Sequence, residues 1–202
     1  MKKASDNWFD VDKEGLKQLQ LGKPKHYLVR ELIQNAWDEK VETVKLEISF
    51  KNGETFISIE DDNKDGFRDL RDGYTLYKET YKRKDPEKRG RFNLGEKEAF
   101  SISEHAEIIT TKGNIVFNKE GRFTSDKKLN SGSIINVWVK MTRGEYEDIL
   151  KTLKLYIVPK GIKFYVNKEL FNYSKPLKVF ETRLMTEISD REIMKRVDRN
   201  TL

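Results

Sequence analysis

The stretch that decides the fold is LVRELIQNAWDE, residues 28–39. At about 100° per residue it forms a helix, and its broad apolar half carries Leu, Val, Ile, Ala and Trp. The same projection places Glu31, Asn35 and Asp38 in one column beside the apolar half, because their spacing is i, i+4, i+7. The sequence therefore predicts a helix that presents two acids and an amide beside its buried face.

The polar column of this helix has two interpretations. A solvated stripe is the common explanation for such a pattern. The alternative is a site, because carboxylate and amide oxygens are hard ligands suited to Mg²⁺ and its waters. A Glu among them can also act as the general base for a water molecule. The helix alone leaves both interpretations open.

Composition limits the class of protein. The chain has 202 residues, which suits one domain with at most a small appendage. Its net charge of +6 is compatible with an anionic partner, such as a nucleotide or a nucleic acid, and equally with no charged partner. The chain has no Cys and only His26 and His105, which excludes thiolate and multi-His metal sites. Because neither a membrane span nor a signal peptide is recognisable, we expect no membrane contact and a cytoplasmic location.

Periodicity predicts an antiparallel sheet bracketed by helices. Strands over 43–50 and 55–61 form a hairpin around Asn52-Gly53, and residues 105–118 form a second hairpin that turns at Lys112-Gly113. Further strands are expected within 132–139 and 161–171, and helices over 12–22, 25–39, 68–78, 95–102, 143–153 and 187–202. This pattern predicts an α+β fold, a two-layer sandwich whose mixed, mostly antiparallel sheet carries its helices on one face.

Later segments contain turns and glycines suited to a ligand. In ISIEDDNKDGF, residues 57–67, a strand runs into an acidic turn, and an Asp there can accept a hydrogen bond from an exocyclic amine such as that of adenine. In KRGRFNLGEKEAF, residues 88–100, Gly90 and Gly95 allow backbone N–H groups to approach an anion. Residues 81–91 carry six basic and two acidic side chains, which suits a triphosphate lid, a solvated loop or a nucleic-acid patch.

The order of these features resembles the GHKL ATPases, the family of DNA gyrase, heat-shock chaperones, histidine kinases and MutL. The family motif E-x-x-x-N-A-x-D-A stands here as ELIQNAWDE, and D-x-G-x-G as the altered DDNKDGF. The glycine-rich lid stands as GRFNLGEKEAF, and the Gly-Thr that precedes a strand as Gly132-Ser133. The resemblance covers about residues 10–140. Its first and third motifs are fairly specific together, whereas the second and fourth are weak alone.

The resemblance implies a Bergerat-like ATP-binding domain over residues 1–142. Residues 143–202 would then be a helix–strand extension, the start of a transducer-like segment, and we expect a fragment of a longer protein or a domain completed by a partner. Glu31 would be the general base, Asn35 would bind Mg²⁺, and Asp38 would support the nucleotide pocket. Further implied contacts to ATP are Asp61, Asp62, Gly66, Gly90, Arg91, Phe92, Asn93, Leu94, Gly95, Lys97 and Ser133.

This sequence departs from the family pattern at three places. The acidic turn lacks the first family Gly, so that strand alternation selects Asp61 as the adenine partner while counting back from Gly66 selects Asp62. We favour Asp61, because the strand's period of two fixes which way a side chain faces. In the lid, Asn93 replaces a family Gly, and Asn tolerates left-handed backbone better than most residues. Glu39 replaces the Ala that often ends the first motif.

We expect an ATP-binding domain that depends on Mg²⁺, hydrolyses ATP slowly to ADP and phosphate, and uses lid closure as a switch. A homodimer formed by ATP-gated closure, a protein partner or further domains would supply the output. One alternative is a basic nucleic-acid-binding module, for which Lys82–Arg91 supplies charge and Tyr77, Tyr81 and Phe92 supply aromatic rings. Another is a scaffold that binds ATP without hydrolysing it.

Overall fold

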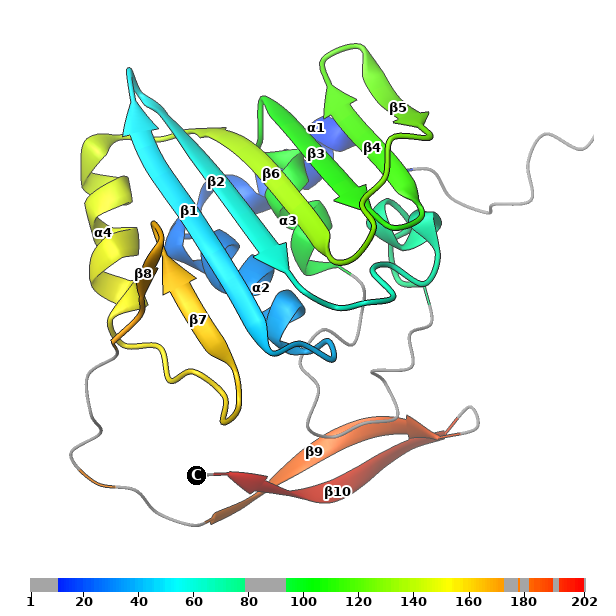
Figure 1. Ribbon diagram of the computed structural model, residues 1–202, viewed down its shortest axis with the longest axis vertical. Helices are drawn as coiled ribbons and strands as arrows, with labels where there is room; N and C mark the ends of the chain where they lie inside the picture. The colour runs from blue at the N-terminus through cyan, green and yellow to red at the C-terminus, as the bar shows by residue number, and fades with distance from the viewer. Residues whose placement is uncertain (1–10, 79–93, 173–177, 179–181, 191–192, 202) are drawn as a thin grey trace, which may run out of the picture.

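An eight-stranded sheet with the order β5-β4-β3-β6-β2-β1-β7-β8 forms one layer of the molecule (Figure 1). The computed structural model describes residues 11–78, 94–172, 178, 182–190 and 193–201. Neighbouring strands run antiparallel except β1 and β7, which are parallel. The strands are β1 (Thr43–Lys51), β2 (Glu54–Asp61), β3 (His105–Thr110), β4 (Gly113–Asn118), β5 (Gly121–Ser125), β6 (Ser133–Lys140), β7 (Lys163–Val166) and β8 (Glu169–Leu170).

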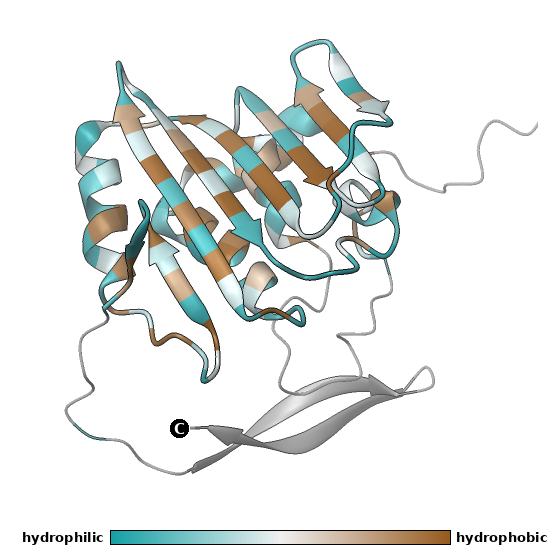
Figure 2. Ribbon diagram, in the orientation of Figure 1, coloured by the Kyte–Doolittle hydropathy of each residue, from teal (hydrophilic) through white to brown (hydrophobic). Residues whose placement is uncertain are grey.

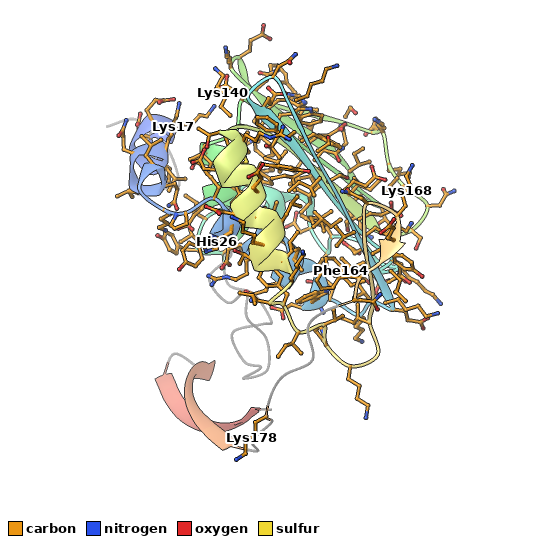
Figure 3. The ribbon with its side chains drawn as sticks, turned by 90° about the vertical axis from the view of Figure 1, so that its left-hand side faces the viewer. Lys17, His26, Lys140, Phe164, Lys168 and Lys178 are labelled. Atoms are coloured by element: carbon orange, nitrogen blue, oxygen red, sulfur yellow. The ribbon has the colours of Figure 1, made fainter. Side chains whose placement is uncertain are left out.

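Helices form the second layer, on one face of this sheet, as the side view in Figure 3 shows. They are α1 (Lys13–Leu21), α2 (His26–Trp37), α3 (Gly95–Ser101) and α4 (Arg143–Leu153), and a short 3-10 helix, η1 (Leu70–Gly73), follows β2. The predicted α+β sandwich, with its mixed sheet and one helical face, is confirmed. Within the described part of the chain, no helix has the length and apolar character needed to cross a membrane.

The core lies between α2 and the sheet. The apolar half of α2 is buried, as are the alternate residues of β1 and β2 that face it, and Figure 2 shows this alternation as brown and teal bands along the strands. Each such side chain contributes about 1.5–3 kcal/mol when it is fully buried. The buried residues of α2 are Leu28, Val29, Leu32, Ile33, Ala36 and Trp37. Because this half is anchored in the core, the polar column beside it has a fixed position.

Residues beyond 142 add to the same core. Ile149 and Leu153 of α4 are buried, and the Phe164 ring of β7 meets the Trp37 ring edge-on, with the two centroids 5.3 Å apart. A capping box at the start of α4 satisfies the backbone N–H groups there. These contacts place α4 and β7 beside α2, while the division into two units at residue 142 stays a prediction.

Three sequence-based expectations about secondary structure are wrong, and one strand was missed. The helix expected over 68–78 is only the short 3-10 helix η1, Leu70–Gly73. The tail is not helical, because β9 (Thr182–Asp190) and β10 (Ile193–Thr201) form a separate antiparallel pair. Each strand contains three β-branched residues, which favour extended backbone. The hairpin of β3 and β4 turns one residue earlier than predicted, since Thr110 pairs with Gly113. Finally, β5 was not predicted: all its residues are exposed, so no apolar alternation marks it.

Candidate functional site

Glu31, Asn35 and Asp38 project from α2 as predicted, but into different surroundings. The Glu31 side chain is 33% exposed, and its Oε1 lies 3.2 Å from a guanidinium nitrogen of Arg30. Asn35 is half-buried, and Asp38, which ends the helix, is buried at 2% exposure. The column therefore runs from an accessible carboxylate to a fully buried one along a single helix edge.

The start of α3 packs directly on this column. A Cβ atom added to Gly95 would lie 2.8 Å from Oε2 of Glu31, so glycine lets α3 approach α2 here without displacing the Glu31 carboxylate. One residue later, Oε2 of Glu96 accepts a hydrogen bond from Nδ2 of Asn35 at 2.6 Å. The structure thus brings Gly95 of the predicted lid beside Glu31 and Asn35.

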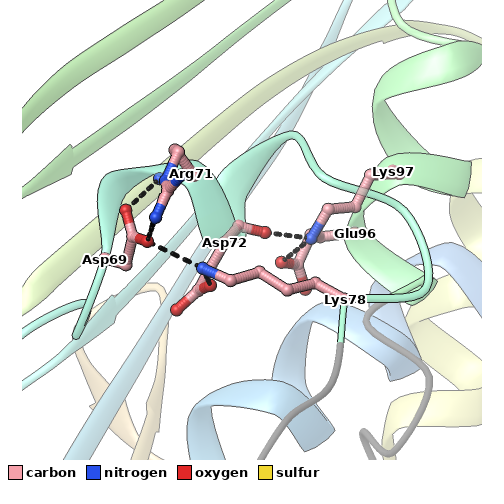
Figure 4. A network of polar contacts seen from close by, with 6 residues as sticks. All are labelled: Asp69, Arg71, Asp72, Lys78, Glu96 and Lys97. Carbon is pink, nitrogen blue, oxygen red and sulfur yellow. Dashed lines mark hydrogen bonds and ion pairs between the residues drawn. The ribbon is translucent and has the colours of Figure 1, made fainter. Parts of the chain in front are cut away.

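Lys97 is buried and lies within a polar network that joins α3 to the segment around η1 (Figure 4). Its Nζ is 2.6 Å from Oε1 of Glu96, and it also donates to the backbone carbonyl of Asp72. The Asp72 carboxylate binds Lys78, whose ammonium lies 2.8 Å from Asp69 as well. The predicted phosphate ligand Lys97 is therefore near the column, but protein groups compensate its charge.

A groove of about 390 Å³ opens beside Glu31, between the start of α2, the connection from α1 and the α3 helix. Its rim is charged: Lys23 pairs with Glu98 at 3.4 Å, and the Arg30 guanidinium lies 4.5 Å from the centre of the Tyr27 ring. Glu31 therefore lines a groove with a charged rim that is large enough for water molecules.

The acidic turn places Asp61 against the first residue of β6, Ser133, with which it pairs in the sheet. Burial raises the pKa of Asp61 to about 7, and the negative charge of Glu39 adds to this effect. Hydrogen bonds from the Asn63 backbone N–H, at 3.0 Å, and from the Ser133 side chain lower the pKa and oppose that rise. Asp61 is thus a half-buried carboxylate held between two donors.

Asp62 lies in solvent instead. Its Oδ1 accepts a hydrogen bond from the backbone N–H of Glu42 at 2.9 Å, which ties the turn to the residue just before β1. The alternation of β2 therefore predicts the more buried of the two carboxylates correctly. Which of Asp61 and Asp62 binds adenine stays a prediction.

Two glycines with positive φ close the acidic turn against β6. Gly66 has φ +57°, and a Cβ atom there would lie 2.7 Å from Oγ1 of Thr111. Gly132 has φ +84°, and its Cβ atom would overlap the carbonyl oxygen of Asp61. The carbonyl of Asn63 accepts from the N–H groups of both glycines, at 2.9 and 3.0 Å. Gly66 therefore shapes the turn even though the first family Gly is missing.

Sequence reasoning missed two residues of this site, Asn63 and Glu96. Asn63 lies two positions after Asp61, and a run of Asp, Asn and Gly is typical of side chains that hydrogen-bond their own turn. That signal was available in the sequence. Glu96 gave none, because its partner Asn35 meets it only when α2 and α3 pack together, and the contact with its chain neighbour Lys97 does not by itself indicate a site.

Four predicted lid residues lie outside the described residues: Gly90, Arg91, Phe92 and Asn93. Leu94, the N-cap of α3, is half-buried. Across residues 11–78 and 94–172 no cluster of three or more His, Asp or Glu side chains could hold a metal ion alone. Asn35 nevertheless suits a hydrated Mg²⁺, which takes one or two protein oxygens and keeps several waters. Its amide nitrogen is bound to Glu96, so its oxygen is the end directed elsewhere.

Comparison with known proteins agrees with this geometry. A family model described as histidine kinase-, DNA gyrase B- and HSP90-like ATPase matches residues 25–149. This range contains α2, the acidic turn, α3 and the start of β6, and therefore every residue of the candidate site. A search of curated proteins found no matching relative. The family match supports ATP binding, and because it spans well over half of the sequence, the chain belongs to the histidine kinase-, DNA gyrase B- and HSP90-like ATPases.

Proposed function

We propose that this chain binds ATP together with Mg²⁺ and hydrolyses it slowly to ADP and phosphate. The observation that carries the proposal is the edge of α2, where the carboxylate of Glu31 and the amide of Asn35 lie one helical turn apart. Glu31 borders a groove with a charged rim, and Asn35 contacts α3 through Glu96. This arrangement offers a proton acceptor for water beside an oxygen ligand for a hydrated cation.

In this proposal Asp61 accepts a hydrogen bond from the exocyclic amine of adenine. The Ser133 side chain and the Asn63 N–H hold its carboxylate in one orientation, and burial strengthens a hydrogen bond there. Guanine presents a carbonyl oxygen at the corresponding position of its ring, and two acceptors repel. We therefore expect ATP to raise the melting temperature of the protein much more than GTP does.

The phosphate end would be completed by residues 81–97 acting as a lid, with Gly90, Arg91, Phe92, Asn93 and Leu94 around the phosphates. Support comes from the basic charge of this segment and from the packing of Gly95 and Glu96 on α2. Lys97 would exchange protein partners for phosphate oxygens, and Asp38 would support the pocket. Closure would then act as a switch for dimerisation or for a partner, in a cytoplasmic setting.

Substitutions at Glu31 and Asn35 test the proposal, because the two residues are given different roles. Glu31→Ala should leave ATP affinity nearly intact and slow turnover by about 10²–10⁴-fold, the usual loss for a general base. Asn35→Ala should weaken both binding and turnover, because it removes an oxygen from the metal. Isothermal titration beside a phosphate-release assay measures both quantities, and Gln34→Ala, on the same helix outside the column, is the control.

Two results would contradict this assignment. Wild-type turnover by Glu31→Ala would make Glu31 a residue of a polar stripe. ATP binding by the wild-type chain without any phosphate release would make the domain a scaffold that binds ATP without hydrolysing it. Failure of ATP to raise the melting temperature would remove the nucleotide site altogether.

A further inference from the structure

Glu96 is a buried carboxylate that the motif comparison leaves without a role. It is 8% exposed, and both its oxygens have partners. Oε2 accepts from Nδ2 of Asn35 at 2.6 Å, and Oε1 lies 2.6 Å from Nζ of Lys97. Burying a charge is costly unless it is paired, so this acid is retained at a place where an apolar side chain would be the simpler choice.

The chemistry of the contact fixes the orientation of the Asn35 amide. An ionised carboxylate accepts hydrogen bonds and donates none, so the end of the amide that faces Glu96 must be the NH₂ group. The amide oxygen then points away from Glu96. An Asn without such a partner can present either end, whereas a metal ligand must present oxygen.

We propose that Glu96 is a positioning residue, which holds the Asn35 amide with its oxygen toward Mg²⁺ and links that amide to Lys97. The inference rests on the proposed function, because it gives Asn35 the role of metal ligand. Lys97 supplies the positive charge that compensates Glu96. Through Asp72 and Lys78 the same network continues to the segment around η1 (Figure 4). One buried carboxylate thus joins the metal ligand to the residue proposed for phosphate.

The test compares ATP affinity in Mg²⁺ with ATP affinity in EDTA. Glu96→Gln keeps the shape of the side chain, but its single oxygen can serve only one of the two partners. Residues that orient metal ligands typically contribute 10–100-fold in metal affinity. We expect Glu96→Gln to lose about tenfold or more of the gain in affinity that Mg²⁺ provides, with binding in EDTA unchanged. Glu98→Gln is the matched control, because Glu98 lies on the same helix and pairs with Lys23 instead.

A reciprocal exchange gives a second test. In the double variant Asn35→Asp with Glu96→Gln, the carboxamide and the carboxylate change places and the hydrogen bond reverses its polarity. The double variant should recover the Mg²⁺-dependent gain relative to Asn35→Asp alone, which sets two carboxylates against each other. A role in stability alone predicts no such recovery. If Glu96→Gln does not fold, Glu96→Asp keeps the charge, withdraws the oxygens by one methylene and should show the same selective loss.

Three outcomes would overturn the inference. The first is a Glu96→Gln protein with the full Mg²⁺-dependent gain, and the second is equal weakening in Mg²⁺ and in EDTA. In both cases loss of the gain in Asn35→Ala would leave the proposed function intact. The third is an Asn35→Ala protein that keeps the whole gain, which removes Asn35 as a metal ligand and the role of Glu96 with it.

Discussion

The two ends of the candidate site are built in different ways. At the strand end, the pairing of β2 with β6 sets Asp61 against Ser133, and backbone hydrogen bonds to Asn63 close the turn. At the helix end, side-chain charges and amides hold α2 to α3, through Asn35 and Glu96. The strand end therefore depends on backbone geometry, whereas the helix end depends on the pairing of buried polar groups.

This difference predicts which substitutions each end tolerates. At the strand end, a change of side-chain charge should cost little folding stability. An added carbon atom should cost much more, because the backbone segments there are in contact. The helix end should accept small changes of shape but not the loss of one charge, because an unpaired buried ion is strongly unfavourable. The following experiments test the two halves of this statement.

The largest effect on stability is expected for Lys97→Met at the helix end. Lys97 has a side chain 6% exposed, and its removal leaves the Glu96 carboxylate buried without its cation. Breaking a buried pair in this way costs about 3–5 kcal/mol of unfolding free energy. Lys78→Met is the control, because Lys78 is 28% exposed and solvent screens its pairs with Asp69 and Asp72, so its loss should cost far less. Urea unfolding measures both variants, and equal losses would show that burial is not what matters.

A smaller effect is expected for Gly132→Ala at the strand end. Gly132 and Gly53 have similar φ values, +84° and +78°, but only at Gly132 would a Cβ atom meet another group, the carbonyl of Asp61. Both substitutions should cost about 1–2 kcal/mol for the left-handed backbone. Gly132→Ala should cost a further 1–3 kcal/mol or so for overpacking. Thermal unfolding of the pair measures the difference, and equal melting temperatures would refute the close backbone contact.

Substitution of Asp61 and of Asp62 tests which of these two adjacent acids at the strand end binds adenine. Asp61→Asn should weaken ATP binding by about 10–100-fold, because a hydrogen bond to a charged acceptor is worth about 1.5–3 kcal/mol. Asp62→Asn should change it little, since Asp62 is exposed and bonds to Glu42. Isothermal titration measures ATP affinity in both variants. A larger loss in Asp62→Asn than in Asp61→Asn would assign adenine binding to Asp62.

The smallest effect on ATP binding concerns pH. With the pKa of Asp61 raised from 3.8 to about 7 by burial, its carboxylate forms in the folded protein only near neutrality. ATP affinity should therefore rise by up to about tenfold between pH 6 and 8. The contribution of this group to stability has the opposite sign. The folded state holds the proton that the unfolded chain has lost, so stability falls as pH rises from about 4 to 7. Both trends should vanish in Asp61→Asn.

The strand end was largely predictable from the sequence, and the helix end was not. Strand alternation placed Asp61 on the same face as Ile57 and Ile59, and Gly132-Ser133 marked the start of β6, because these signals act within a few residues. The column on α2 followed from helical spacing for the same reason. Glu96 with Asn35, and Lys97 with the Asp72 carbonyl, depend on how two distant helices approach each other. No local pattern contains that information, and neither β5 nor the tail strands showed an apolar face to predict.

The parallel pairing of β7 with β1 has a consequence for the order in which the chain folds. Thr43 of β1 pairs with Lys163 of β7. During synthesis, β1 is therefore made long before β7, its second neighbour in the sheet. Until then its edge presents unpaired N–H and C=O groups, which are a template for pairing with another copy of the chain. Contacts so distant in sequence also form slowly. We therefore expect shortened chains that end before residue 166 to give less soluble protein, because β7 is then missing and cannot cover that edge. Changes in the nucleotide site should matter less for the yield.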